Sequence, residues 1–325
     1  MSSGEKRTVT IGIPKSLFYW KKPYFWETFF EGLGLKVVLS PKTNKDIIER
    51  GLKIADPETC FASKVFFGHI AWLEEQNLDY IFVPRLKRNE LGLEFCPRFF
   101  GLPDLIPLFI KTRVISPKID LKKESLEKTL AKLGKKIVGN KRELIKKAIE
   151  KSFQKEKEIK EKNEKEFFNK IGLKKKKIIL ISHPYNLYDD YANLGMEKKV
   201  EKLGIEVIFI DKIPAYQELN DSISNVSFHW EFGQEMIAQI KQILNENISG
   251  AIEVSSFQCG CDAVLKEFIE KEFRLRKIPF LYILIDEHTS DAGLQTRIEA
   301  FVEMARRKRK KLMLESITAK SVKTL

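Results

Sequence analysis

The chain has 325 residues, of which 43% are hydrophobic and 32% are charged, and its formal net charge is +13. This length is enough for two ordinary domains with hydrophobic cores, whereas no apolar run approaches the about 18–20 residues of a membrane span. The N-terminus also lacks the apolar stretch of a secretory signal. We therefore expect a soluble, cytoplasmic protein without a membrane partner, whose four cysteines are metal ligands, reactive thiols or core residues rather than disulfides.

Strands and helices alternate through residues 1–119, which are predicted to form a first α/β domain. Such alternation is typical of βαβ units, in which helices join parallel strands of one sheet. The predicted strands are Thr8–Ile13, Lys36–Leu39, Tyr80–Val83 and Arg113–Ile115, and the predicted helices are Tyr24–Leu33, Asn44–Ile54 and Ala62–Gln76.

A basic segment follows at residues 120–172. From Lys122 to Lys177 the chain holds 21 Lys and Arg against 9 Glu, a balance of +12 that makes up nearly the whole net charge. Opposite charges are interleaved at helical spacing and large apolar residues are few, so we predict a solvated helical connector or lid. A second basic run, Arg306–Lys311, falls where cations complement the dipole of the last predicted helix. No nucleic-acid-binding motif accompanies either run, so a nucleic-acid partner is not expected.

Residues 173–310 repeat the alternation and are predicted to form a second α/β domain, followed by a flexible tail at 311–325. Polar residues and cysteines concentrate in the loops after its strands. In a parallel sheet these loops meet at the carboxyl edge, where ligands bind, so a functional site is predicted there. The predicted strands are Ile178–Ser182, Glu206–Ile210, Ala251–Val254 and Phe280–Ile285, and the predicted helices are Tyr191–Leu203, Trp230–Asn245, Ala263–Arg276 and Ala292–Arg307.

The four cysteines are the main candidates for chemistry. Cys259 and Cys261 flank a single glycine, a spacing that does not permit an unstrained disulfide. Cys60 and Cys96 are isolated, whereas zinc sites usually pair their ligands at short spacing. Iron–sulfur clusters accept scattered thiolates, and Cys60 begins a predicted helix whose dipole favours a thiolate. The spacing leaves four buried, unreactive thiols as an open alternative.

Six stretches in order along residues 8–307, apart from the basic segment, carry a resemblance to a known family. They are IGIPKSLFYW, PETCFASKVFFGHI, FVPRLKRNE with CPRFFGLPD, SHPYNLYD, SSFQCGCDAV and IDEHTSDAGLQTRIEAFVEM. They resemble the 2-hydroxyacyl-CoA dehydratase D-component-like family, also described as acyl-CoA dehydratase activase-related. Its superfamily includes subunits of 2-hydroxyglutaryl-CoA dehydratase and benzoyl-CoA reductase, and double-cubane cluster proteins.

The resemblance implies two flavodoxin-like parallel-sheet domains with a [4Fe-4S] cluster in the interdomain cleft. Cys60, Cys96 and Cys259 match the ligand positions. The superfamily implies an ATP-dependent activator with its own iron–sulfur cluster as partner, an acyl-CoA substrate, and radical dehydration or a related reduction. Cys261 departs from the related motifs. As a fourth ligand it would close the cluster, whereas three ligands leave one iron open, which is the arrangement we favour.

Two other functions stay open from the sequence. The first is a non-catalytic electron-transfer or cluster-carrier protein, and the second is a structural subunit that binds zinc or no metal. A homodimer or heterodimer is compatible with each of them. The chain lacks a phosphate-binding glycine-rich motif, so we do not expect it to hydrolyse ATP itself.

The remaining polar candidates lie in loops after predicted strands. His183 and His288, with Glu287, are candidates for general acid–base catalysis, although either histidine could instead fix its loop. Residues that could hold the cleft or an anionic ligand are Asn186, Arg297, Lys15 and Lys64, and histidines expected to be structural are His69 and His229.

Overall fold

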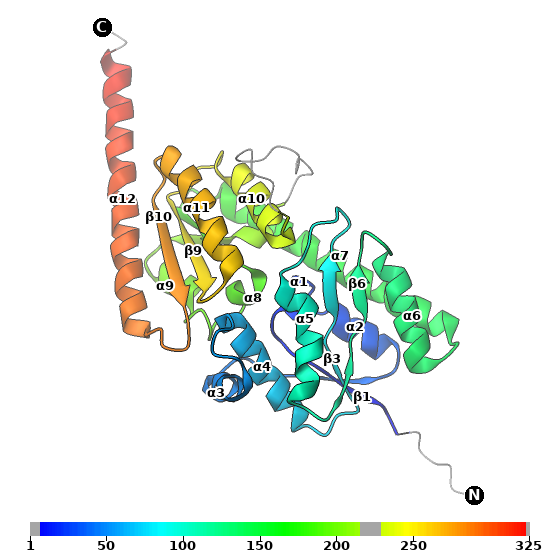
Figure 1. Cartoon of the computed structure of the whole chain (residues 1–325). Coiled ribbons are helices and arrows are strands. Elements are labelled where there is room, and N and C mark those ends of the chain that lie inside the picture. Colours follow the sequence, from blue (N-terminus) through cyan, green and yellow to red (C-terminus); the bar gives the residue numbers. More distant parts are fainter. Residues whose placement is uncertain (1–6, 215–228, 323–325) are drawn as a thin grey trace, which may run out of the picture. The chain divides into compact units, whose positions relative to one another are not determined.

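A computed structural model describes residues 7–214 and 229–322, with side chains described as far as Arg307 in the last helix. The described chain divides into two compact units, one of residues 7–162 and 229–234 and the other of residues 163–214 and 235–322. Each unit contains helices and a parallel sheet (Figure 1), so the predicted α/β class is confirmed. None of the described helices is long and apolar enough to cross a membrane.

The first unit is built on a four-stranded parallel sheet in the order β2–β1–β3–β5. Two further strands, β4 (Arg85–Arg88) and β6 (Lys118–Asp120), pair in parallel as a separate small sheet that the sequence did not predict. The strands of the larger sheet are β1 (Thr10–Ile13), β2 (Lys36–Leu39), β3 (Tyr80–Phe82) and β5 (Arg113–Ile115).

Aromatic side chains fill the core of the first unit. The ring of Phe82, on β3, lies 4.8 Å from Trp26, 4.9 Å from Phe30 and 5.7 Å from Phe18, measured between centroids. All four side chains are almost fully buried, and burial of such large apolar surfaces is the main stabilisation of a fold. The helices of this unit are α1 (Phe18–Lys21), α2 (Phe25–Gly32), α3 (Lys45–Ile54), α4 (Phe61–Glu74), α5 (Pro97–Leu105), η1 (Ile106–Leu108) and α6 (Leu126–Val138).

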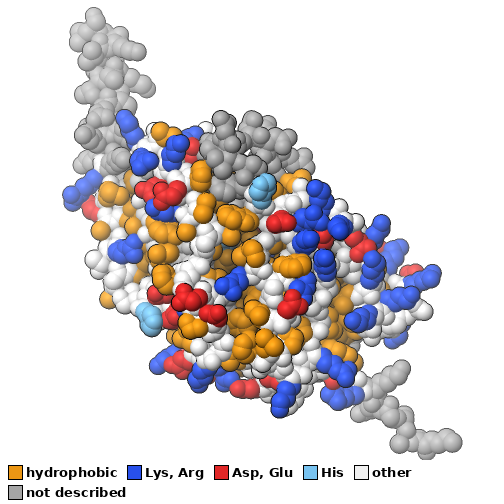
Figure 2. Space-filling view, in the orientation of Figure 1, with side chains coloured by type: hydrophobic (Ala, Val, Ile, Leu, Met, Phe, Trp, Pro, Cys, Tyr) orange, Lys and Arg blue, Asp and Glu red, His pale blue; other side chains and the backbone are white. Residues whose placement is uncertain are grey.

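The basic segment is amphipathic rather than solvated all round. It forms α6 and the long helix α7 (Arg142–Gly172), which begins in the first unit and ends in the second. Leu130, Ile145 and Ala148 are buried, and Ala148 lies against Gly32 of α2. The outer faces carry many of the lysines, and Figure 2 shows Lys and Arg gathered over α6 and α7.

The second unit has the strand order β10–β9–β7–β8, so β7 is paired on both sides as β1 is in the first unit. The central strands β7 and β9 are buried along their whole length. Figure 1 shows α11 and α12 on opposite sides of this sheet. The elements are β7 (Lys177–Ile181), α8 (Pro184–Leu187), α9 (Met196–Lys202), β8 (Glu206–Phe209), η2 (Ile210–Lys212), α10 (Glu231–Ile243), β9 (Gly250–Ser256), α11 (Gly260–Leu275), β10 (Phe280–Ile285) and α12 (Asp291–Val322).

Three helix boundaries differ from the prediction by three residues or more. Helix α9 begins at Met196 rather than Tyr191. Helix α11 begins at Gly260 rather than Ala263, so Cys261 lies in its first turn and Cys259 is its N-cap. Helix α12 continues to Val322, although the prediction ended it at Arg307 and placed a flexible tail after it. The basic run therefore lies within this helix and does not mark its end.

Helices α3 and α4 approach each other through two glycines. A Cβ added at Gly51 would lie 2.0 Å from the carbonyl oxygen of Lys64, and one at Gly68 would lie 1.8 Å from that of Ile47. Because each clash is with backbone, we expect Gly51→Ala and Gly68→Ala each to lower the free energy of unfolding by about 2 kcal/mol. Urea denaturation measures this.

Gly101 provides the matched control for these two variants. It also lies in a helix of the same unit, but nothing lies within 4 Å of its added Cβ. Alanine there is expected to leave the stability unchanged or to raise it by about 0.5 kcal/mol. Equal stability of all three variants would contradict the close approach of α3 and α4.

Candidate functional site

The carboxyl edge of the second sheet brings two loops together. Strand order reverses at β7, and in a doubly wound sheet the loops leaving the carboxyl ends on either side of such a point bind ligands. The register pairs Ile181, the last residue of β7, with Glu253 of β9. His183, just beyond β7, and Cys259, just beyond β9, therefore leave the same edge of the sheet.

His183, Cys259 and Asp262 lie together there, with the histidine and the aspartate buried and the cysteine half-buried. Nε2 of His183 lies 2.6 Å from Oδ1 of Asp262, and the side chain of Cys259 also hydrogen-bonds this aspartate. The Ser255 hydroxyl donates to Oδ2 of Asp262 at 2.7 Å. Ligand atoms of the three residues lie within 4.8 Å of one another, close enough to hold a metal ion. Imidazole, thiolate and carboxylate are a donor set suited to zinc or iron.

Two buried carboxyl groups of this site differ in ionisation. Burial raises the pKa of Asp262, but the charge of His183 and hydrogen bonds from His183, Ser255 and Cys259 outweigh it, so this pKa lies below its ordinary value. Burial, and then the negative charge of Asp262, raise the pKa of Glu253 well above the ordinary value. Oε2 of Glu253 has no hydrogen-bond partner among the described residues. Ionisation is therefore favoured at Asp262 and opposed at Glu253, because two like charges this deep would repel.

Neighbouring residues fix the two loops. Asn186 donates to Ser182 and accepts from the Ser256 hydroxyl, both at 3.0 Å, which ties the loop after β7 to the end of β9. The ring of Tyr185 stacks on His183 at 4.9 Å between centroids. Gln258, the residue before Cys259, has a φ of 64°, a left-handed conformation that is uncommon outside glycine. Cys259 therefore directly follows a residue in the left-handed conformation.

The other predicted residues of this unit lie apart from the group. His288 is exposed in the turn after β10, where its backbone N–H donates to Asp286 at 2.9 Å. Glu287 lies half-buried in the same turn, and Arg297 donates to the carbonyl oxygen of Tyr282. The structure therefore brings His183 together with Cys259, but it does not place His288 or Glu287 in this group.

Sequence reasoning missed Asp262, Ser255 and Glu253. Glu253 could have been found, because a lone carboxylate in an apolar strand needs a special environment. Asp262 directly precedes the predicted helix Ala263–Arg276, a position that indicates no role in a site. Its contact with His183 spans 79 positions, and it depends on strand order that the pattern of apolar residues does not give.

Cys60 and Cys96 are neighbours in the first unit. Cys60 is the N-cap of α4 and Cys96 is the N-cap of α5. Sγ of Cys60 lies 3.2 Å from the Ser63 hydroxyl. Burial raises the pKa of Cys60 and the nearby Cys96 raises it further, whereas Ser63 and Arg98 lower it. Burial therefore opposes the thiolate form of Cys60 in the metal-free protein, against the helix dipole that favours it.

The predicted lysines and structural histidines have other surroundings. Nζ of Lys15 lies 5.6 Å from the ring centroid of Trp20, and Lys64 is buried in α4. His69 is fully buried, with Ser40 and Thr43 as hydrogen-bond partners. The carbonyl oxygen of His229 accepts from the N–H of Glu94 at 2.7 Å, while its side chain is exposed.

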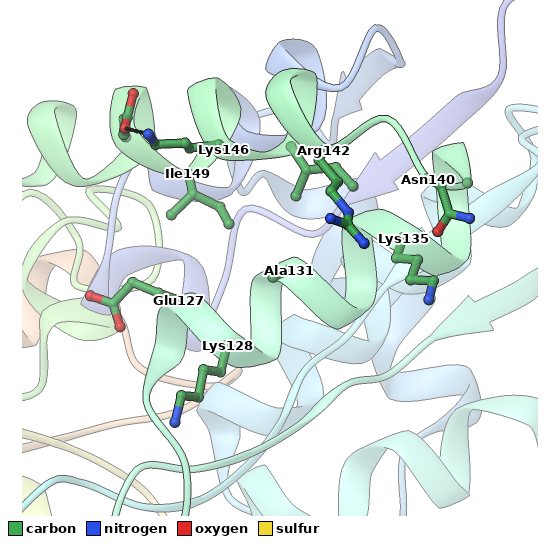
Figure 3. Close-up of a pocket in the computed structure, with 11 residues that line it drawn as sticks. Glu127, Lys128, Ala131, Lys135, Asn140, Arg142, Lys146 and Ile149 are labelled. Carbon is green, nitrogen blue, oxygen red and sulfur yellow. Dashed lines mark ion pairs between the residues drawn. The ribbon is translucent and has the colours of Figure 1, made fainter.

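A groove of about 530 Å³ lies between α6 and α7. Figure 3 shows its cationic side chains around the apolar Ala131 and Ile149. It has the size of a small-molecule pocket, but it contains none of the predicted site residues. Its cations are Lys128, Lys135, Arg142 and Lys146.

Comparison with known proteins gives one informative match. A family model described as CoA enzyme activase uncharacterised domain (DUF2229) matches residues 10–213. No curated protein matches the chain. Two solved structures align over 92% of the chain with a TM-score of 0.29, which is too low to indicate a shared fold. They are titled crystal structure of ZnuA, at 12% identity over 98% of that chain, and crystal structure of 138-173 ZnuA deletion mutant plus zinc bound, at 14% identity over 97% of that chain.

Proposed function

Because the chain belongs to the CoA enzyme activase DUF2229 family, we propose that it is an iron–sulfur protein of acyl-CoA dehydration or reduction. In this proposal Cys60, Cys96 and Cys259 bind one [4Fe-4S] cluster, and both flavodoxin-like units supply ligands. An ATP-dependent activator reduces the cluster. The substrate class is a 2-hydroxyacyl-CoA or a related thioester, and the chain is a lyase or oxidoreductase component.

One observation supports the ligand set most strongly: all three cysteines are N-caps. Cys60, Cys96 and Cys259 directly precede α4, α5 and α11, and none of these helices has a side-chain cap hydrogen bond at that position. The first N–H groups of a helix are unpaired and carry partial positive charge. Each cysteine is therefore placed where a thiolate bound to iron gains hydrogen bonds and a favourable field.

The residues present fit such a group. Thiolates are the ligands that iron–sulfur clusters require. Burial opposes deprotonation of the Cys60 thiol, but metal binding displaces this proton. Ser63 would hydrogen-bond the Cys60 sulfur, a contact that tunes reduction potential. The bound cluster would supply one-electron chemistry. Cys261 lies one position further into α11 and stays a neighbour rather than a ligand in this proposal.

A second candidate function has its own observation. His183, Cys259 and Asp262 form a complete three-ligand set within the second unit. A single divalent ion such as zinc could bind there without Cys60 or Cys96. The chain would then be a structural or hydrolytic metal protein rather than a redox protein.

Metal analysis after anaerobic purification separates the two functions. The proposed function predicts about four iron and four sulfide per chain after reconstitution, as a [4Fe-4S] cluster requires, with an EPR signal that changes on reduction. The second candidate predicts about one zinc per chain and no sulfide. A colourless protein without iron after reconstitution would refute the proposed function.

A further inference from the structure

Helix α5 carries an exposed apolar surface that the proposed function does not explain. Phe100, Leu105, Leu108 and Phe109 are 37%, 38%, 74% and 44% exposed. We call these four residues the α5 face. Phe100 and Leu105 lie on α5, Leu108 lies on the short η1 that continues it, and Phe109 follows η1 directly. Figure 2 shows apolar side chains over α5. Clustered exposure of large apolar side chains is typical of interaction surfaces.

Cations surround Phe100, the residue of this face nearest to Cys96. The Phe100 ring centroid lies 5.1 Å from Cζ of Arg85, 6.0 Å from Nζ of Lys87 and 5.8 Å from Nζ of Lys118. Asp104 on α5 is engaged by Arg85. Neither lysine forms an ion pair within the part of the chain that the structure describes. The charge of Lys87 acts on Asp120, which Arg88 already engages. A partner that covers Phe100 would therefore meet a net positive surface.

The α5 face starts at a proposed cluster ligand. Cys96 is the N-cap of α5, and Phe100 follows one helical turn later. At 1.5 Å per residue, the nine residues of α5 extend about 14 Å from Cys96. A protein docked over Phe100 would therefore lie about one helical turn from Cys96.

We propose that the α5 face is the docking surface for the electron donor of this protein, a partner whose surface presents carboxylates around an apolar centre. This inference rests on the proposed function. On docking, the donor gives up one electron and is oxidised, and the cluster bound through Cys96 is reduced by that electron. The positive rim steers the acidic partner into place, and the apolar centre holds it.

The groove between α6 and α7 supplies the control. It is also basic and belongs to the same unit, but it contains no part of α5. Steering by net charge alone would use either surface, whereas docking at Cys96 requires the α5 face. Charge reversal at the two places therefore distinguishes a specific site from general attraction.

The test uses the reconstituted full chain and a purified, cluster-loaded ATP-dependent dehydratase activator reduced with dithionite. We expect Leu108→Asp, and separately Lys87→Glu with Lys118→Glu, to slow reduction by the activator about tenfold at low salt. High salt should shrink the lysine effect by screening. Lys128→Glu with Lys135→Glu is expected to stay within about twofold of the wild type.

Iron content and the EPR spectrum after direct chemical reduction are measured for every variant. Unchanged spectra with slowed activator reduction support the inference. A wild-type chain without a cluster overturns the proposed function itself. A cluster-loaded wild type with equally fast α5-face variants, or with a slowed groove variant instead, overturns the docking surface alone.

Discussion

Serine at Cys60, Cys96 or Cys259 is expected to lower the iron bound per chain about tenfold, because each substitution removes one of three thiolate ligands. The sulfide content should fall in parallel, and the EPR signal of the reduced protein should be lost. All three positions are N-caps with intermediate exposure, so the substitutions leave the core intact. Circular dichroism checks that each variant folds.

Cys261→Ser is the matched control, since this cysteine lies two residues from Cys259 and has the same intermediate exposure. We expect it to keep iron and sulfide at the wild-type level. Loss of iron in this variant would instead make Cys261 the fourth ligand and favour an electron carrier. His183→Gln and Asp262→Asn extend the comparison. If these two and Cys259→Ser lose metal while Cys60→Ser and Cys96→Ser keep it, the metal belongs to the second unit alone.

The larger parallel sheets were predictable because their strands are short apolar runs between turn residues. Lys36–Leu39, Arg113–Ile115 and Phe280–Ile285 have the predicted bounds. Strand β4 was missed because its sequence RLKR resembles a polar loop, and its partner β6 has only three residues. Periodicity finds strands that bury an apolar face, and it fails where pairing is set by tertiary contacts.

Individual residues of the site were predictable from the sequence, but their grouping in space was not. His183 and Cys259 were singled out because each follows a strand, yet the sequence does not state that β7 and β9 are neighbours. His288 follows β10, which pairs with β9 rather than β7, and so it reaches a different part of the edge. Cysteine identity drew attention to SSFQCGCD, while Asp262, the residue that joins the group, has no distinctive spacing.

The burial of His69 in the first unit predicts that the free energy of unfolding falls at acid pH. This histidine is fully buried, Nδ1 lies 2.8 Å from the Ser40 hydroxyl, and Nε2 lies 3.1 Å from that of Thr43. Burial, together with the positive charge of Lys15, lowers its pKa from 6.5 to about 3. Between these values the unfolded chain binds a proton that the folded chain does not, so stability falls as the pH falls through this window.

We expect wild-type protein to lose about 3 kcal/mol more stability between pH 7 and pH 4 than His69→Gln, which cannot take up that proton. Urea denaturation at both pH values measures the free energy of unfolding of each protein. Because the comparison is between two pH values of the same protein, any stability that the substitution itself costs at neutral pH cancels. The exposed His288 gives the control, since His288→Gln should keep the wild-type difference. An equal loss in wild type and His69→Gln would mean that His69 is protonated in the folded state. In that case His69 could not fix the loop after β2 as a neutral hydrogen-bonding residue.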